Sequence, residues 1–272
     1  MRLTRLPRPA LRPFVEVLWA VDDTTGAWSL SAARERVLPT GRMHLAVRLS
    51  DAPVRLYADA DSPDGWTVGH VVVGGARTTS YIRDVSSPSR SVGAQLRPGA
   101  AWWLFGVPAD TLAGRHTSLG DLRGRPTGEL RDRLLHCTGL EHQLECLESW
   151  LSGRLPRVHS LHPAVAHALE RFGDDTPPVQ RVVAEVGLSH RRFIEVFRNA
   201  VGLAPKAYCR VLRFRRAVHL LGTGLATNVV EVALAAGYAD QSHFTREFSE
   251  LAGLTPGEYR RMAPRLPHHV RV

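Results

Sequence analysis

The sequence predicts an α+β protein in two parts, a β-rich N-terminal half and an all-helical C-terminal half. Three observations support this prediction. Residues 1–98 hold short runs rich in Val, Leu, Tyr and Trp between turn residues, as in a small barrel or sandwich. Residues after 156 have helical patterns that Gly and Pro interrupt. The C-terminal half also contains an internal repeat.

In the N-terminal half we expect six strands followed by short helices. The strands span 14–21, 43–49, 53–58, 66–73, 81–85 and 91–96, and the helices span 100–105, 108–112, 129–136 and 141–151. These elements predict a domain of residues 1–152. Residues 153–160 would form a linker, 161–264 a helical domain, and 265–272 a tail without ordered structure.

The repeat in the C-terminal half pairs residues 182–187 with residues 232–237 at an offset of 50. After one inserted residue the offset is 51, and the matching pairs are Phe193 and Phe244, Phe197 and Phe248, Gly202 and Gly253, Leu203 and Leu254, Pro205 and Pro256, Tyr208 and Tyr259, and Arg210 and Arg261. Two copies are too few for a solenoid, so they indicate two similar helical modules.

Each copy has the plan of a helix-turn-helix. A short apolar helix, 179–186 or 229–236, ends at a glycine, and Ser189 or Asp240 then starts a second helix as its N-cap. The residues that would build the structural cores are Gly187, Phe193, Phe197, Gly237, Phe244, Phe248 and Pro256. A long helix over 204–221 would join the units, and its Arg215 and Arg216 would reach only phosphates. The alternative is an all-helical core domain that touches no DNA.

The overall composition is that of a globular protein, with 44% apolar and 22% charged residues in 272. No run approaches the ~18 uninterrupted apolar residues of a membrane span. Glu16 interrupts the apolar run near the N-terminus, which makes a poor signal peptide. Three cysteines are too few, and odd in number, for a disulfide framework. We therefore expect a cytoplasmic protein that is not bound to a membrane.

Positive charge is concentrated towards the C-terminal end. The chain carries 35 Lys+Arg against 26 Asp+Glu, a net charge of +9. Residues 176–265 hold 13 basic and 7 acidic residues, whereas the other 182 residues hold 22 and 19. This distribution favours a nucleic-acid or anionic-surface partner. The alternative is a solvated basic face without a partner.

The second copy, VALAAGYADQSHFTREFSELAGLTPGEYRR, resembles the signature of the AraC/XylS family of transcription regulators. The resemblance rests on Ala233, Ala236, Gly237, Gln241, Ser242, Phe244, Arg246, Phe248, Gly253, Pro256 and Tyr259. It covers about residues 161–261 and implies two helix-turn-helix units that dock in successive major-groove segments. By position, it implies that the base-facing residues are Arg191, Ile194 and Glu195 in the first unit and Gln241, Ser242, His243 and Arg246 in the second.

Side-chain chemistry supports the second set more firmly. The guanidinium of Arg246 can fork to guanine O6 and N7, and the amide of Gln241 can read adenine. Ser242 and Thr245, near the N-terminus of the helix, can hold phosphates.

The first set is a less usual mixture. Ile194 can touch thymine methyl groups and Glu195 can accept a hydrogen bond from cytosine N4, while Arg191 can reach a base or a phosphate. Alternatively, Glu195 pairs with Arg191 or Arg198 and contacts no base.

The N-terminal half resembles, less specifically, a sensor domain that is attached to many such regulators. The shared traits are Trp19, the VLPTG segment at 37–41 and the LRPGAAWWLFGVPA segment at 96–109. Thr40 stands where an Asp is expected after Leu-Pro. The resemblance implies that this half senses a small-molecule effector or mediates self-association as a homodimer.

Candidate metal ligands are few. His44, His70 and His116 have no chelating spacing but could converge in a cupin-like barrel, and His142 and Cys146 are four residues apart on an expected helix. We assign none of them to a metal. Trp19, Trp66, Trp102 and Trp103 could line an apolar pocket, although aromatic residues in a small β domain more often belong to its core.

Together these features predict a sequence-specific regulator of transcription whose partner is double-stranded DNA and, through the promoter, RNA polymerase. We expect no enzyme activity, because no nucleophile elbow, P-loop or dinucleotide fingerprint is present, and we expect no cofactor. Two alternatives remain: a cupin-like metalloenzyme fused to a helical module, and a DNA-repair protein that has the same helical domain and a reactive cysteine.

Overall fold

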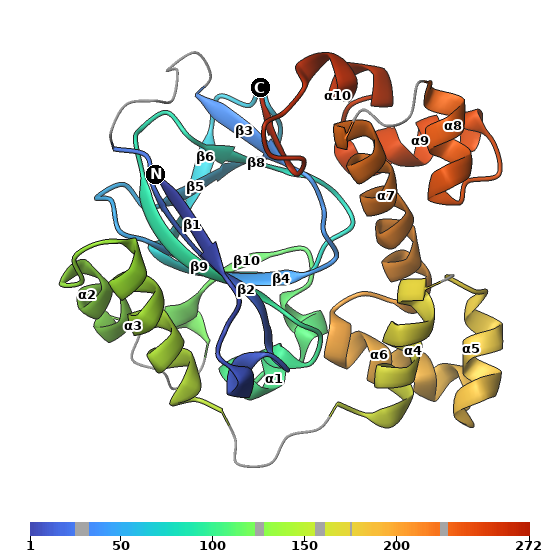
Figure 1. Cartoon of the computed structure of the whole chain (residues 1–272), viewed down its shortest axis with the longest axis horizontal. Helices are drawn as coiled ribbons and strands as arrows, with labels where there is room; N and C mark the ends of the chain where they lie inside the picture. Colours follow the sequence, from blue (N-terminus) through green and yellow to red (C-terminus); the bar gives the residue numbers. More distant parts are fainter. Residues whose placement is uncertain (25–32, 123–127, 156–160, 175, 224–227) are drawn as a thin grey trace.

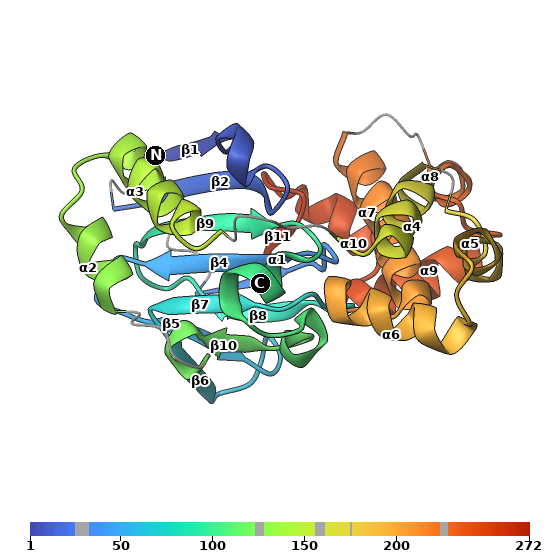
Figure 2. The same cartoon turned by 90° about the horizontal axis from the view of Figure 1, so that it is seen from below.

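The computed structural model describes residues 1–24, 33–122, 128–155, 161–174, 176–223 and 228–272. Two antiparallel sheets form the N-terminal half, and a group of helices lies beside them (Figures 1 and 2). The mixed fold predicted from the sequence is therefore confirmed. No helix in the described ranges is long and apolar enough to cross a membrane.

The strands form two open sheets, so the expected barrel is not confirmed. The six-stranded sheet runs in the order β1 (Arg2–Arg5), β2 (Val15–Asp22), β9 (Arg90–Leu96), β4 (Met43–Arg48), β7 (Val71–Gly74) and β10 (His116–Ser118). The five-stranded sheet runs in the order β11 (His269–Arg271), β3 (Arg34–Val37), β8 (Tyr81–Asp84), β5 (Val54–Tyr57) and β6 (Gly65–Gly69). The strand expected over 66–73 is in fact two strands in different sheets, because the backbone turns at Gly69, where φ is +135°.

The outer face of the six-stranded sheet packs against helices. Along β4, Met43, Leu45 and Val47 are buried, whereas the residues between them are half-buried. The buried face joins one core with α1 (Ala100–Phe105), α2 (Gly128–Leu135) and α3 (Leu140–Ser152). The alternation of β4 therefore turns its other face towards the second sheet.

Seven helices of the C-terminal half follow the sequence pattern closely. They are α4 (Pro163–Asp174), α5 (Val179–Val186), α6 (His190–Val201), α7 (Pro205–Thr223), α8 (Val229–Ala236), α9 (Gln241–Ala252) and α10 (Pro256–Met262). The connector expected over 204–221 is α7. Most of the expected linker, residues 156–160, lies outside the described residues.

The two repeats differ in what covers their cores. Phe193 and Phe197 of the first repeat belong to a separate cluster with Phe172 of α4. Phe244 and Phe248 of the second repeat belong to the large core that also contains the N-terminal strands. The second unit is therefore continuous in packing with the N-terminal half.

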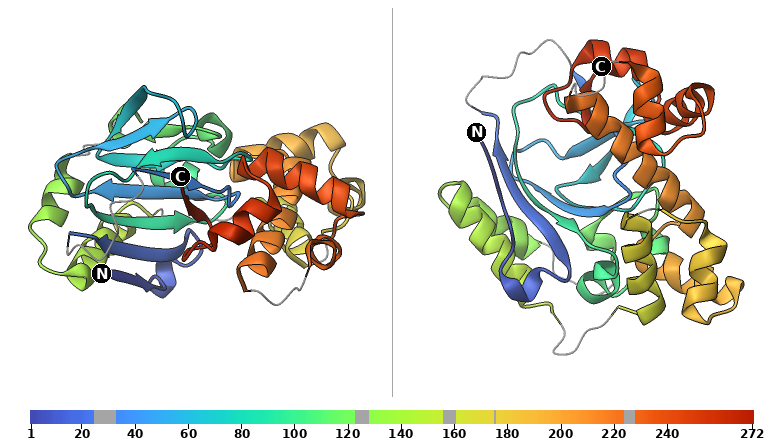
Figure 3. Two further views of the ribbon diagram at one scale, coloured as in Figure 1. Left: turned by 90° about the horizontal axis from the view of Figure 1, so that it is seen from above. Right: turned by 45° about the vertical axis from the view of Figure 1, so that its right-hand side comes forward.

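The expectation that residues 265–272 have no ordered structure is wrong. They form β11, which pairs antiparallel with β3, so the C-terminal end lies against the N-terminal half (Figure 3). Val270 is fully buried, and the Tyr259 hydroxyl of α10 donates a hydrogen bond to the Pro267 carbonyl oxygen at 2.9 Å. The free edge of β3 and the apolar side chain of Val270 together order this segment.

Candidate nucleic-acid interface

The first helix-turn-helix unit consists of α5, a tight turn and α6. Helix α5 ends at Gly187, whose φ of +67° is left-handed and suits glycine. The Ser189 hydroxyl accepts a hydrogen bond from the Arg192 amide at 3.3 Å and caps α6. Phe193 and Phe197 are fully buried, so the opposite side of α6 faces outward.

The second unit repeats this construction with α8 and α9. Helix α8 ends at Gly237, with a φ of +90°, and the Asp240 carboxylate accepts a hydrogen bond from the His243 amide at 2.7 Å. Phe244 is fully buried and its ring lies 5.0 Å from the ring of Tyr238. Both candidate recognition helices therefore begin at a capped N-terminus and present one polar side.

On α6, the three candidate contact residues lie on or near the surface. Arg191 and Glu195 are exposed, whereas Ile194 is half-buried. Glu195 pairs with Arg192 at 3.0 Å, and not with either arginine considered from the sequence, because residues three apart adjoin on a helix. Both side chains of this pair remain more than half exposed, so the pair leaves Glu195 available for another partner.

On α9, the candidate residues divide into two groups. Gln241, Ser242 and Arg246 are exposed, and Thr245 is half-buried beside them. At about 100° per residue, these four side chains share an arc of about 140° on the helix. His243 lies outside that arc, since its ring packs edge-on against Tyr238 with centroids 5.4 Å apart.

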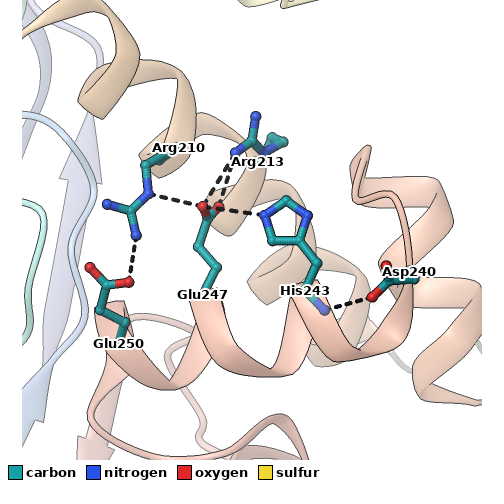
Figure 4. A network of polar contacts seen from close by, with 6 residues as sticks. All are labelled: Arg210, Arg213, Asp240, His243, Glu247 and Glu250. Atoms are coloured by element: carbon teal, nitrogen blue, oxygen red, sulfur yellow. Dashed lines mark hydrogen bonds and ion pairs between the residues drawn. The ribbon is translucent and has the colours of Figure 1, made fainter.

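A buried carboxylate that the sequence analysis missed holds α9 against the connector helix α7 (Figure 4). Glu247 is 6% exposed and accepts hydrogen bonds from Arg210 Nε at 2.9 Å and Arg213 Nη2 at 3.2 Å. His243 Nε2 approaches the same carboxylate at 3.8 Å, and Glu250 accepts from Arg210 Nη2 at 2.7 Å. Arg210 and Arg213 are three residues apart on one helix, and Glu247 and Glu250 are three residues apart on another. This equal spacing is the feature of the sequence that could have predicted the network.

The hydrogen bonds of this network favour the charged state of the Arg210 guanidinium. Burial disfavours the charged guanidinium of Arg210, but its hydrogen bonds to Glu247 and Glu250 outweigh burial and raise its pKa. The network therefore fixes the direction in which α9 presents its exposed side.

The structure does not support phosphate contacts by the connector arginines. Arg216 Nη2 donates a hydrogen bond to the Gly173 carbonyl oxygen at 3.0 Å. Arg215 is half-buried on the side facing Arg42 and Tyr208, and burial lowers its pKa. Arg216 is therefore held by an intramolecular hydrogen bond, and Arg215 is partly shielded from solvent.

The candidate metal ligands do not form a cluster. The rings of His44 and His116 lie 5.5 Å apart, but His70 is bonded elsewhere, to the Asp51 carbonyl oxygen at 2.9 Å. His142 Nδ1 contacts the Thr138 carbonyl oxygen at 2.8 Å. Across the described ranges, no group of three or more His, Cys, Asp or Glu side chains is placed to hold a metal ion.

The four tryptophans considered as a pocket lie apart. Trp66 and Trp102 are exposed, and Trp103 packs on the main core. Trp19 is half-buried on the face of β2 that looks towards the second sheet. Of these four tryptophans, Trp19 alone therefore remains a candidate for contact with a ligand.

Two family models match the chain. Residues 182–262 match a model described as a helix-turn-helix domain, and residues 3–118 match one described as a domain of unknown function (DUF6597). The first match covers both units described above. The second covers most of the two sheets.

Several curated regulators resemble the C-terminal half. The chain is 30% identical over 100 residues to the HTH-type transcriptional regulator MtrA of Neisseria gonorrhoeae, a match that covers 36% of this chain and 33% of that protein. It is 31% identical over 103 residues to the RCS-specific HTH-type transcriptional activator RclR of Escherichia coli, covering 37% and 36%. The matched segment is thus about a third of the length of these relatives.

Two solved structures are also similar to this chain. ToxT of Vibrio cholerae has a TM-score of 0.48 at 10% identity, with 97% of this chain and 99% of that chain covered. A transcriptional regulator with an AraC-type DNA-binding domain from Chromobacterium violaceum has a TM-score of 0.35 at 25% identity, with 38% and 94% covered.

Proposed function

The C-terminal half of this chain is a tandem helix-turn-helix domain of the AraC/XylS type, and on this premise we propose that the protein is a sequence-specific regulator of transcription. Residues 161–264 bind promoter DNA, and residues 1–152 control that binding or mediate self-association as a homodimer. The protein acts in the cytoplasm, where it alters promoter occupancy or contacts RNA polymerase.

One observation carries this proposal: two capped helices of the same construction, α6 and α9, each leave a polar side exposed. The connector α7 has 19 residues and is therefore about 28 Å long, close to the ~34 Å between successive major-groove segments on one side of a duplex. A rigid connector of this length suits simultaneous docking of both helices.

We assign roles to individual residues from their side-chain chemistry together with their exposure. Arg246 and Gln241 read base edges, and Ser242 and Thr245 hold phosphates near the N-terminus of α9. In the first unit, Arg191, Ile194 and Glu195 face the groove. His243 has a smaller role in base reading than its position in the sequence implied, since it contacts Tyr238 and Glu247.

The test is binding of the full chain to a panel of single-base variants of a selected operator at fixed salt. Arg246→Ala should weaken the free energy of binding to the cognate site by about 1–3 kcal/mol and remove the sequence preference at one base pair. Arg55→Ala, which changes an exposed arginine of β5 in the N-terminal half, is the matched control and should bind as the unmodified chain does. Equal weakening on every variant would make Arg246 a phosphate contact and overturn its role in base reading.

A further inference from the structure

The N-terminal half contacts both candidate recognition helices at their C-terminal ends. The Gly99 amide donates a hydrogen bond to the Ala200 carbonyl oxygen of α6 at 2.7 Å. The Ser80 amide donates one to the Leu251 carbonyl oxygen of α9 at 2.8 Å. Ala200 and Leu251 are 51 residues apart, which is the offset of the internal repeat. The N-terminal half therefore meets the two helices at equivalent positions.

These hydrogen bonds complete the two helix ends. The last four carbonyl groups of an α-helix have no partner within the helix, and Ala200 and Leu251 are each among the last four. Leu251 is buried, so a donor from the protein takes the place of water. The N-terminal half thus supplies donors that the helices themselves lack.

The glycine that ends each helix allows a close approach. Gly202 ends α6 and Gly253 ends α9, with left-handed φ values of +89° and +70°. A Cβ added at Gly202 would lie 3.1 Å from the Ala109 carbonyl oxygen, and one added at Gly253 would overlap Arg36 Nη1. The same Arg36 atom donates a hydrogen bond to the Ser80 hydroxyl at 3.3 Å, which holds the second contact in place. A larger residue at either glycine would push the helix end away from the N-terminal half.

A third contact lies on the connector helix. A Cβ added at Gly41, where φ is +68°, would lie 3.1 Å from Val211 Cγ1 of α7. Gly41 ends the VLPTG segment at 37–41, and Gly99 belongs to the segment at 96–109. Both segments by which the N-terminal half resembles a sensor domain therefore contact the helical half.

Strand ends carry the three contact points. Gly41 precedes β4, Ser80 precedes β8 and Gly99 follows β9. Met43, the first residue of β4, pairs with Leu96, the last residue of β9, so these two strand ends lie together. The helices of the C-terminal half lie beside this end of the sheets (Figure 2). Because strand pairing fixes these positions, the N-terminal half offers the helices a rigid base.

The connector helix alone holds the two units less precisely. Cys209 of α7 packs in the cluster of the first unit, whereas Phe214 packs in the large core with the second unit. A bend of about 10° in this helix would displace one end by about 5 Å over its length of about 28 Å. One base-pair step of a duplex is about 3.4 Å and about 35°. A bend of that size would therefore move one recognition helix by more than a base-pair step.

We propose that the N-terminal half is a template that fixes the distance and the angle between α6 and α9, with Gly99, Ser80 and Arg36 as its positioning residues. The full chain then accepts one spacing between the two half-sites of an operator. This consequence for DNA rests on the proposed function, whereas the fixed geometry of the helices does not.

The first test measures that geometry in the full chain without DNA. Spin labels on non-natural amino acids replace Arg191 and Ser242, which are exposed and equivalent in the repeat, and double electron–electron resonance measures the distance between them. We expect one narrow distribution of distances. Gly202→Leu and Gly253→Leu should each broaden or shift it, whereas Gly106→Leu should not. Gly106 is the matched control because it ends α1 with a φ of +73°, and a Cβ added there would meet no described atom within 4 Å.

The second test measures binding of the full chain to operators selected with the unmodified protein and remade with one base pair added or removed between the half-sites. The unmodified chain and Gly106→Leu should bind the altered operators at least about tenfold more weakly than the parent. Gly202→Leu and Gly253→Leu should bind the parent more weakly and distinguish the spacings by less than about threefold. Arg36→Ala covers failure of these variants to fold, since it removes a hydrogen bond without straining the backbone, and should change both measurements in the same direction.

Three results would overturn the proposal. An unchanged distance distribution in the folded variants would show that α7 alone sets the geometry. Equal binding of the unmodified chain to all spacings would show that the DNA does not depend on this geometry. Tighter binding of the variants to the parent operator would show that the N-terminal half holds the helices in a geometry that opposes binding. Failure to select any operator would contradict the proposed function, and the distance measurement would still decide whether the N-terminal half fixes the helices.

Discussion

Replacing the buried carboxylate of Glu247 by an amide, as Glu247→Gln, tests how α9 is held on α7. The side chain is 6% exposed and contacts Arg210, Arg213 and His243. The amide keeps the size of the group but removes its charge, and its NH2 group cannot accept from a guanidinium. The expected result is lower stability of the second unit and weaker binding to every DNA sequence.

The magnitude follows from the exposure of the partners. Removing one member of a fully buried ion pair costs about 3–5 kcal/mol. Here the side chains of Arg210 and Arg213 are 28% and 25% exposed, so water partly replaces the lost carboxylate. Arg210 also keeps its contact with Glu250. We therefore expect a loss of about 2 kcal/mol in the free energy of unfolding.

The assay is urea unfolding of the full chain, followed by circular dichroism at 222 nm because the affected region is helical. Glu250→Gln is the matched control, since its side chain is 59% exposed and should contribute less than about 0.5 kcal/mol. Equal stabilities of the two variants would refute the view that Glu247 anchors α9. Unchanged DNA affinity in Glu247→Gln would refute its role in orienting the helix.

Two further predictions concern the N-terminal half and its attached strand. Burial lowers the folded-state pKa of His44 and of His268 to about 4, so the unfolded chain takes up these protons before the folded chain does. The free energy of unfolding should therefore decrease as the pH falls from 6.5 to 4. The decrease should be up to about 1.4 kcal/mol per pH unit for each histidine. Thermal unfolding across that range should show the slope, His268→Gln should flatten it, and a Tm independent of pH would contradict the burial argument. Val270→Ala should lower the free energy of unfolding by about 2 kcal/mol because the side chain is fully buried. Amide hydrogen exchange should then become faster in β3 and α10 together. Faster exchange confined to β11 would show that this strand is not coupled to α10.

The sequence predicted the four helices of the two repeats well because each begins or ends at a local signal. Gly187, Ser189, Gly237 and Asp240 have the conformations or hydrogen bonds that their positions predicted. Such signals depend on neighbours within a few residues, so a single sequence reveals them.

The missed elements depend on partners that are distant in the chain. Strand β11 exists because β3 offers it an edge, and Glu247 is buried because two arginines on another helix meet it. The inner face of the N-terminal sheets was missed for the same reason, since His44 and Tyr81 come from different sheets. No periodicity within one segment reports such pairings. The base-reading residues remain predictions, because exposure is compatible with several partners.

The pairing of β11 with β3 also has a consequence for folding during synthesis. His269 is 234 residues beyond Glu35, so the ribosome makes all of the residues between them before this pair can form. Until then, β3 has an unpaired edge, the kind of surface at which nascent chains associate wrongly. Chaperones that shield exposed strands should therefore bind the nascent chain after β3 has paired with β8, and release it once β11 has emerged.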